Sequence, residues 1–212
     1  MDTPNFQQKL GLAAEHLKRH DPILKPVILQ HGLCSITPHT NYYQALVSSI
    51  IGQQLSVKAA KTIRLRFYAL FGDTDTPSPE EIMTKSVEEL RAAGLSNAKA
   101  RYVQDLAVHV IDGRLKLADF DTLTSTEIIK ELTAVKGIGE WTAHMFMMFT
   151  LGRLDILPVG DLGIKNGIKK LYGFDIAPDA DKIREIAKSN NWHPYESIAC
   201  WYIWRSLDND PA

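Results

Sequence analysis

The stretch KGIGEWTAHMF, residues 136–146, constrains the fold of this chain more than any other. Two glycines flank one isoleucine, and a largely apolar, helix-forming run follows at once. Upstream, Thr124 and Glu127 stand at capping-box spacing ahead of apolar residues at helical intervals. Because glycine permits the backbone angles of a tight turn, residues 135–139 are predicted to join two helices. The segment from about 124 to 150 is then a helix–hairpin–helix.

Such a turn presents main-chain N–H groups at the start of its second helix. These donors and the helix dipole suit an oxyanion such as a DNA phosphate, and glycine leaves no side chain in its way. An ordinary helix end followed by a tight turn explains the GIG motif equally well. The rest of the sequence must therefore decide between the two interpretations.

Helical patterns run along most of the chain, whereas the alternating patterns typical of strands are short. Apolar residues recur at helical spacing within 57–71, 97–110 and 162–171. The segment 86–94 opens with a capping-box pattern and ends at a glycine. We expect the segment DTDTPSPEE, residues 73–81, to be a loop. The chain is predicted to be all-α.

Composition excludes several classes of protein. Of the 212 residues, 45% are hydrophobic and 23% are charged, as in soluble globular proteins. No stretch approaches the ~18 apolar residues of a membrane span, and no secretory signal pattern is visible. Cys34 and Cys200 are too few for a four-cysteine zinc or iron–sulfur site and fit a reduced, intracellular protein. With a net charge of −1, a nucleic-acid partner would need local positive patches and backbone dipoles.

Two paired motifs indicate a family. LTAVKGIGEWTA followed by RLDILPVGDLGIKNG resembles the helix–hairpin–helix Gly/Pro/Asp superfamily of DNA glycosylases. Within it, the chain is most similar to the alkylated-base branch, the DNA-3-methyladenine glycosylase II type. The stretches ALVSSIIGQQLSVKAAKTI and EELRAAGLSNAKARYVQDLA also resemble that branch. The resemblance covers roughly residues 40–205.

The resemblance implies a fold of two α-helical lobes, with DNA and a flipped base in the active-site cleft between them. The central lobe would run over about 35–153 and include the hairpin. The second lobe would combine 1–34 with 154–212 and carry the catalytic Asp. We expect a monomer that binds duplex DNA, requires no cofactor and does not associate with membranes. Its location would be the cytoplasm, or the nucleus in a eukaryote.

The resemblance also assigns the catalytic role to Asp161. When a glycosidic bond breaks, positive charge develops on the sugar, and a nearby carboxylate stabilises that charge and orients the attacking water. A plainer role is open to the same residue, because an Asp after Gly160 and before a helical pattern is a favourable N-cap. Asp161 can serve both purposes. The other acid of the motif, Asp155, is predicted to make structural hydrogen bonds.

Three residues match positions of the base pocket in the relatives: Trp141, Trp204 and Met145. An alkylated purine is cationic in the nucleotide and departs as a neutral base, and electron-rich rings attract such a base. Trp204 would serve equally well as a core residue, and Met145 stands where relatives carry an aromatic ring. Trp141 occupies the position of the lysine nucleophile of bifunctional relatives. We therefore expect base release without strand cleavage.

Other residues are expected to contact the base stack and the backbone of the DNA. Gln54 or Leu55 in GQQLSV is predicted to fill the gap left by the flipped nucleotide, with a core position as the alternative for Leu55. Lys99, Arg101 and Lys136 are candidates for supporting positive charge, with ordinary solvated surface as the alternative. Phosphate would bind to the N–H groups of Gly137, Ile138, Gly139 and Thr142. A monovalent cation, Na⁺ or K⁺, would bind to the main-chain carbonyls of Thr133, Val135 and Gly137.

The resulting hypothesis is a monofunctional DNA glycosylase that flips alkylated purines, of the 3-methyladenine and 7-methylguanine type, out of duplex DNA. Hydrolysis of the N-glycosidic bond would initiate base excision repair. One alternative is a glycosylase of the same fold for hypoxanthine, ethenoadenine or an oxidised base. The other is a non-catalytic helix–hairpin–helix module that only binds DNA.

Overall fold

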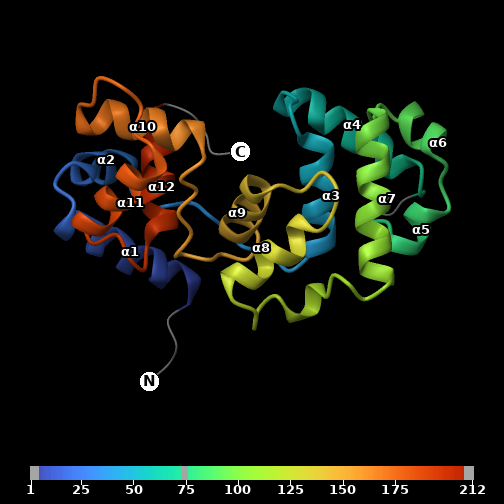
Figure 1. Cartoon of the computed structure of the whole chain (residues 1–212), viewed down its shortest axis with the longest axis horizontal. Coiled ribbons are helices and arrows are strands. Elements are labelled where there is room, and N and C mark those ends of the chain that lie inside the picture. The colour runs from blue at the N-terminus through green and yellow to red at the C-terminus, as the bar shows by residue number, and fades with distance from the viewer. Residues whose placement is uncertain (1–4, 73–75, 208–212) are drawn as a thin grey trace. The chain divides into compact units, whose positions relative to one another are not determined.

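The computed structural model describes residues 5–72 and 76–207 (Figure 1). Within those residues every regular element is a helix, which confirms the predicted all-α class. No helix of the described chain is long and apolar enough to cross a bilayer. The chain divides into two compact units, one of Pro38–Leu151 and one of Met1–Thr37 together with Gly152–Ala212.

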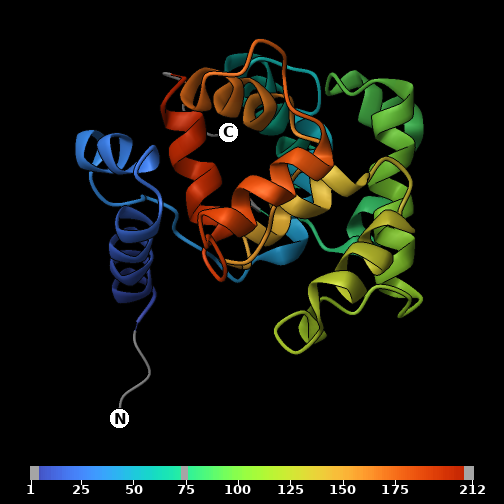
Figure 2. The ribbon, with the colours of Figure 1, turned by 60° about the vertical axis from the view of Figure 1, so that its left-hand side comes forward.

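The discontinuous unit is built around its last helix. Its elements are α1 (Phe6–His20), α2 (Leu24–His31), α10 (Leu162–Tyr172), α11 (Ala180–Ser189) and α12 (Glu196–Arg205). Helix α12 contacts α1, α2 and α10, and Figure 2 shows it in red beside the orange α10. It is buried without interruption from Ser197 to Trp204 because its sequence is apolar on all sides.

A buried carboxylate ties together distant parts of this unit. Asp21 is fully buried, and its side chain accepts hydrogen bonds from the main-chain N–H groups of Ile23 and Leu24, each at 2.9 Å. The indole N–H of Trp192 donates to the same carboxylate at 2.7 Å, and the hydroxyl of Tyr172 also donates to it. Burial and the adjacent Asp21 raise the pKa of Tyr172. Asp21 is thus satisfied by partners from three segments.

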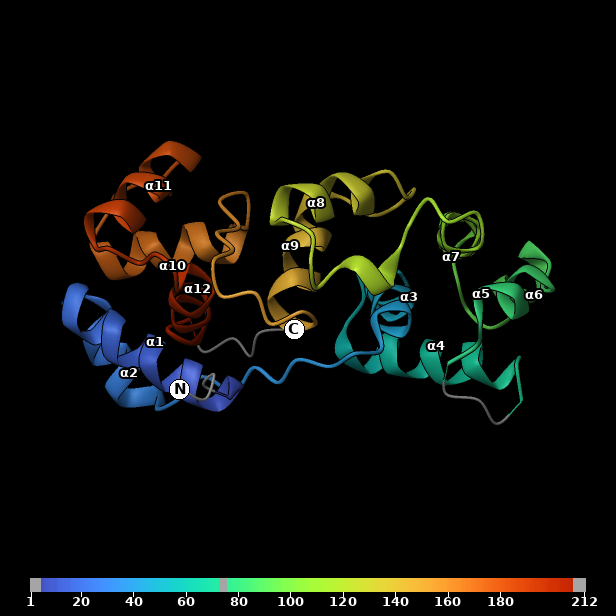
Figure 3. The same cartoon turned by 90° about the horizontal axis from the view of Figure 1, so that it is seen from below.

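The continuous unit is organised by α7 and the hairpin. Its elements are α3 (Tyr42–Gly52), α4 (Val57–Ala69), α5 (Pro79–Met83), α6 (Val87–Ala92), α7 (Asn97–Ile111), a 3₁₀ turn at Leu117–Asp119, α8 (Ser125–Thr133) and α9 (Glu140–Phe149). Helix α7 contacts α3, α5 and α6, whereas α9 contacts α8 and α3. Figure 3 shows α8 and α9 next to each other.

Both predicted capping boxes are confirmed. Ser86 and Glu89 bond reciprocally at the start of α6, as Thr124 and Glu127 do at the start of α8. The loop predicted for 73–81 is wrong from Pro79 onward, because α5 begins there. Ser78 and Glu81 form a third capping box that stabilises this short helix. Residues 73–75 lie outside the described part of the chain.

Candidate active site and DNA-binding hairpin

Asp161 stands at the N-terminus of α10 and is only 9% exposed. Its Oδ1 atom accepts the main-chain N–H of Ile164 at 2.7 Å, so the N-cap role is confirmed. The same oxygen accepts the indole N–H of Trp204 at 2.9 Å. A negative charge at this helix end is stabilised by the helix dipole. The carboxylate is therefore held in one orientation by two donors from two helices.

Trp204 lies in α12 and is 8% exposed. This burial is what a core role for Trp204 predicts. The indole N–H group of Trp204 also orients the carboxylate of Asp161. Cys200, on the same helix, is fully buried. Its burial is the main cause that raises the pKa of its thiol well above the ordinary value, and the nearby carboxylates of Asp161 and Glu196 raise it further. Burial also raises the pKa of Cys34 to about 12. Both cysteines are free, and neither offers a thiolate nucleophile near neutral pH.

Gly163 also belongs to this site, although its role is not among the sequence predictions. A Cβ atom on Gly163 would lie 2.8 Å from Nε1 of Trp204 and 3.0 Å from Oδ1 of Asp161. Gly167, four residues on, is equally close to α12, because its Cβ would lie 2.3 Å from Cγ2 of Ile203. Two glycines spaced by four on the apolar side of an amphipathic helix are the signal that would have revealed this close packing.

Gly163→Ala is expected to slow base release by about 10- to 100-fold, because the added methyl group displaces the indole or the carboxylate and small misplacements at a reacting centre are costly. Single-turnover base release measures the effect, and binding to an abasic duplex measures whether the DNA grip survives. Gly11→Ala is the control, since Gly11 is another helical glycine and nothing lies within 4 Å of its added Cβ. Equal rates for the two variants would contradict this role of Gly163.

The hairpin runs from the end of α8 to the start of α9, and its two glycines meet different demands. Gly137 has φ +84°, and a Cβ atom on it would lie 2.1 Å from the ring of Tyr102. The turn and the packing of Tyr102 both require glycine here. Gly139 has an ordinary φ of −94° as the N-cap of α9, and nothing lies within 4 Å of an added Cβ. No contact within the described residues therefore explains a glycine at 139.

The four predicted phosphate donors are not equivalent. Gly139 is exposed, Gly137 is half-buried, and Ile138 and Thr142 are buried. The N–H of Ile138 already donates to the carbonyl of Val135 at 3.1 Å, so a phosphate would have to replace that bond. In the part of the chain that the structure describes, no side chain caps α9, whereas Thr124 and Asp161 cap α8 and α10. The start of α9 is thus open to an external acceptor.

The pocket and wedge residues of this unit are accessible. Trp141 is 49% exposed in the first turn of α9, and Met145, one turn later on the same face, is half-buried. Leu55 is 37% exposed, which argues against the core alternative. Gln54 is exposed and has φ +56°, an uncommon value for a residue other than glycine. The loop between α3 and α4 therefore presents both wedge candidates to solvent.

The supporting charges differ in accessibility. Lys136 has a side chain that is 76% exposed, and Arg101 is also exposed. The ammonium of Lys99 instead donates to the carbonyls of Ile51 and Gln53, at 2.8 and 2.6 Å. The prediction of Lys99 as a charge directed at DNA is therefore wrong, because two carbonyls at the end of α3 hold it. Asp155 is exposed, and no hydrogen bond of its carboxylate is found among the described residues, contrary to its predicted structural role.

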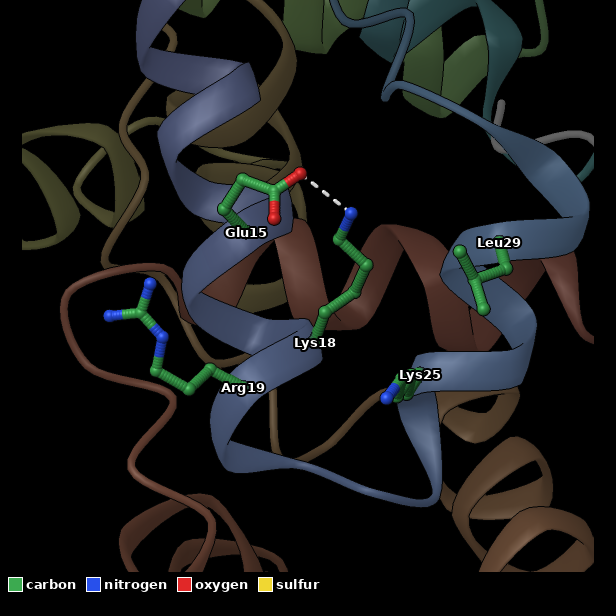
Figure 4. A pocket seen from close by; sticks show the side chains of 5 residues that line it. All are labelled: Glu15, Lys18, Arg19, Lys25 and Leu29. Atoms are coloured by element: carbon green, nitrogen blue, oxygen red, sulfur yellow. Dashed lines mark hydrogen bonds and ion pairs between the residues drawn. The ribbon is translucent and has the colours of Figure 1, made fainter.

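The structure thus collects the site residues in two groups. Asp161 and Trp204 meet in the discontinuous unit, while the hairpin, Trp141, Met145 and the wedge loop belong to the continuous unit. A pocket of about 280 Å³ lies elsewhere, on α1 and α2 (Figure 4). It is lined by Glu15, Lys18, Arg19, Lys25 and Leu29, none of which is a predicted site residue. Among the described residues, no three His, Cys, Asp or Glu side chains cluster as a metal site would require.

Comparisons with known proteins identify the family of this chain. Residues 47–191 match the model of the HhH-GPD superfamily base excision DNA repair proteins. The alkylbase DNA glycosidase-like protein mag2 of Schizosaccharomyces pombe is 30% identical over 197 residues, which are 91% of this chain and 92% of the relative. A putative DNA-3-methyladenine glycosylase of Bacillus subtilis is 32% identical over 87% of this chain and 66% of its own length.

Solved structures show the same fold. The DNA-3-methyladenine glycosidase of Bacillus halodurans aligns with a TM-score of 0.81 and 42% identity, over 92% of this chain and 88% of that one. The 3-methyladenine DNA glycosylase Mag1 of Schizosaccharomyces pombe, solved in complex with abasic DNA, aligns with a TM-score of 0.79 and 30% identity over 93% and 97%. On the family match and these likenesses, the chain belongs to the HhH-GPD superfamily of base excision DNA repair proteins.

Proposed function

We propose that this protein is a monofunctional DNA glycosylase that excises alkylated purines from duplex DNA and so initiates base excision repair. The observation that carries the proposal is the buried carboxylate of Asp161, oriented at the start of α10 by Ile164 and Trp204. Relatives named for 3-methyladenine support the substrate class. The protein would act where the DNA is, in the cytoplasm of a bacterium or the nucleus of a eukaryote.

The chemistry needs little more than an oriented carboxylate. The damaged nucleotide turns out of the stack, because the glycosidic bond is inaccessible inside a duplex. Alkylation at N3 or N7 has already made the purine cationic, so the C–N bond breaks heterolytically and the base leaves neutral. Positive charge moves to the sugar, where Asp161 stabilises it. Water then adds to the anomeric carbon and loses a proton, which leaves an abasic site.

In this proposal, the residues that bind the DNA backbone and fill the stack belong to the continuous unit. The open N-terminus of α9 binds a DNA phosphate, and the exposed Gly139 lets the backbone approach it. Gln54 or Leu55 fills the gap in the stack. Trp141 and Met145 contact the flipped base, and the indole ring attracts an electron-poor purine.

A monovalent cation at the hairpin would support phosphate binding and would take no part in the chemical step. The predicted ligands are the carbonyls of Thr133, Val135 and Gly137. The carbonyl of Val135 already accepts the N–H of Ile138 at 3.1 Å, and that of Gly137 accepts the side-chain amide of Gln53 at 2.7 Å. Each of these carbonyl oxygens keeps a second lone pair, so the two hydrogen bonds do not prevent a cation from binding. The predicted set therefore stays a candidate for Na⁺ or K⁺.

A panel of lesion-bearing duplexes tests the substrate class. Each duplex carries a single 3-methyladenine, 7-methylguanine, hypoxanthine, ethenoadenine or 8-oxoguanine, and released base is quantified under single-turnover conditions. The proposal predicts release of the two methylated purines at the highest rates. Preferential release of the oxidised base would assign the protein to another lesion class, and binding without release from any duplex would indicate a non-catalytic module.

Trp141 makes a separate prediction, because an indole has no amine with which to form a Schiff base. Borohydride added during turnover should trap no protein–DNA adduct, and strand breaks should appear only after alkali. Trp141→Lys is the matched comparison, since it restores an amine at this position. Robust trapping of the wild-type protein, lost in a variant of some other lysine, would reveal a nucleophile that this account lacks.

A further inference from the structure

We propose that Gln53 and Lys99 are positioning residues that fasten the wedge loop to the hairpin, so that phosphate binding and nucleotide extrusion are coupled. The inference rests on the proposed function, because it assigns the two loops the tasks given above. The wedge loop is the segment from Gln53 to Ser56, between α3 and α4. Neither residue is itself placed against the base or the sugar.

Lys99 holds the start of the wedge loop. Its ammonium donates to the carbonyl of Ile51 at 2.8 Å and to that of Gln53 at 2.6 Å. The last carbonyls of a helix have no partner within the helix, and a cation at this end is also favoured by the helix dipole. Gln54 follows at once, with φ +56°. Lys99 therefore holds the backbone that immediately precedes the exposed residue Gln54.

Gln53 carries that restraint to the hairpin. While its own carbonyl accepts from Lys99, its side-chain amide donates to the carbonyl of Gly137 at 2.7 Å. Gly137 is the glycine that the turn requires, with φ +84°. One residue thus connects the backbone of the wedge loop to the backbone of the hairpin, across 84 positions of sequence.

Helix α7 is the common platform for both loops. Lys99, Tyr102 and Asp105 are spaced by three and so lie along one side of it. The ring of Tyr102 fills the space beside Gly137, and the carboxylate of Asp105 accepts the main-chain N–H of Lys136 at 2.9 Å. The wedge loop and the hairpin are therefore anchored to the same rigid helix and to each other.

The consequence is a fixed spacing between the group that binds phosphate and the group that enters the stack. Phosphate contacts position a protein on any duplex, damaged or not. Extrusion requires in addition that the wedge loop lie at the right distance from the phosphate that the hairpin binds. Loss of the connection should therefore slow extrusion and base release, while the binding of intact DNA persists.

The test uses Gln53→Met and Lys99→Met, which keep most of the side-chain volume and remove the donors. Gln104→Met is the matched control, because Gln104 also lies on α7 and its amide donates to a carbonyl, that of Lys85, at 2.8 Å. Lys99→Arg tests rescue by a conservative change. For each protein, extrusion is followed by the fluorescence of 2-aminopurine next to the lesion, and kcat, KM, duplex affinity and thermal unfolding are measured.

We expect kcat and the rate of extrusion to fall about tenfold in Gln53→Met, the scale of one lost hydrogen bond that leaves a carbonyl unsatisfied. The loss should be at least as large in Lys99→Met, which removes two such bonds. Duplex affinity and its salt dependence should stay within about twofold, since no phosphate contact is lost. Lys99→Arg should recover part of the rate, and Gln104→Met should match the wild type. The double variant should be no slower than the slower single variant, because both act through one connection.

Several results would overturn the inference. Wild-type kcat in both methionine variants would show that the connection has no role in turnover. A weaker salt dependence in Lys99→Met would make Lys99 a phosphate contact after all. Rate losses that the Gln104→Met control reproduces at equal thermal stability would indicate a general effect on α7. Failure of the wild-type protein to release any base would overturn the proposed function, and this inference with it.

Discussion

Asp161→Asn should leave a folded protein that binds DNA and releases base at least ~100-fold more slowly, on the scale of other electrostatic catalytic groups. The amide oxygen can still accept the N–H of Ile164 and the indole N–H of Trp204, the two bonds that hold Oδ1. What the substitution removes is the negative charge. The loss should therefore fall on the step in which positive charge develops on the sugar.

The measurement is single-turnover release of a methylated purine, with binding to a stable abasic analogue measured in parallel. Asp155→Asn is the matched control, because it makes the same chemical change six positions upstream in an exposed residue. We expect wild-type rates from the control. Near-wild-type release by folded Asp161→Asn would remove this carboxylate from the mechanism.

Gly139→Asp should weaken the binding of every duplex by about 10- to 100-fold, the range for loss of a hydrogen bond to a charged group. Folding should not suffer, since nothing lies within 4 Å of a Cβ at this position and Asp is a favourable N-cap for α9. The new carboxylate would occupy the N–H groups that bind phosphate and repel the phosphate itself. Damaged and intact duplexes should lose affinity equally, because phosphate contacts carry no lesion information.

Gly139→Asn separates charge from shape. Its side chain has the same size and also caps helices well, but it brings no negative charge. We expect Gly139→Asn to lose less affinity than Gly139→Asp, and thermal unfolding to show both variants folded. A folded Gly139→Asp that binds intact DNA normally and loses only lesion preference would contradict the placement of phosphate at this hairpin.

The local features of this chain were predictable from the sequence. Capping boxes and apolar spacing are properties of neighbouring residues, so Thr124 with Glu127 located α8, and the GIG motif located the turn before α9. The same logic applied to Ser78 and Glu81 would have found α5, but the surrounding prolines favoured a loop. The N-cap role of Asp161 was likewise visible from its place before a helical pattern.

Contacts between distant segments were not predictable. The bond from Trp204 to Asp161 spans 43 positions, and the bonds from Lys99 to the end of α3 span 46 and 48. A lone sequence carries no record of such pairs, so from the sequence Lys99 resembles any other charge available to DNA. The two hairpin glycines show the same limit. Only the position of Tyr102 reveals that the fold needs Gly137, whereas Gly139 is open.

The most direct test of the account is mass spectrometry of one reaction mixture, in which the wild-type protein acts on a duplex with a single 3-methyladenine. We expect free 3-methyladenine and an equal amount of full-length strand in which a hydroxyl has replaced the base. An unchanged strand with protein bound would contradict catalysis. A strand cleaved in proportion to base release would contradict the assignment of Trp141 as a wall of the pocket in a monofunctional enzyme.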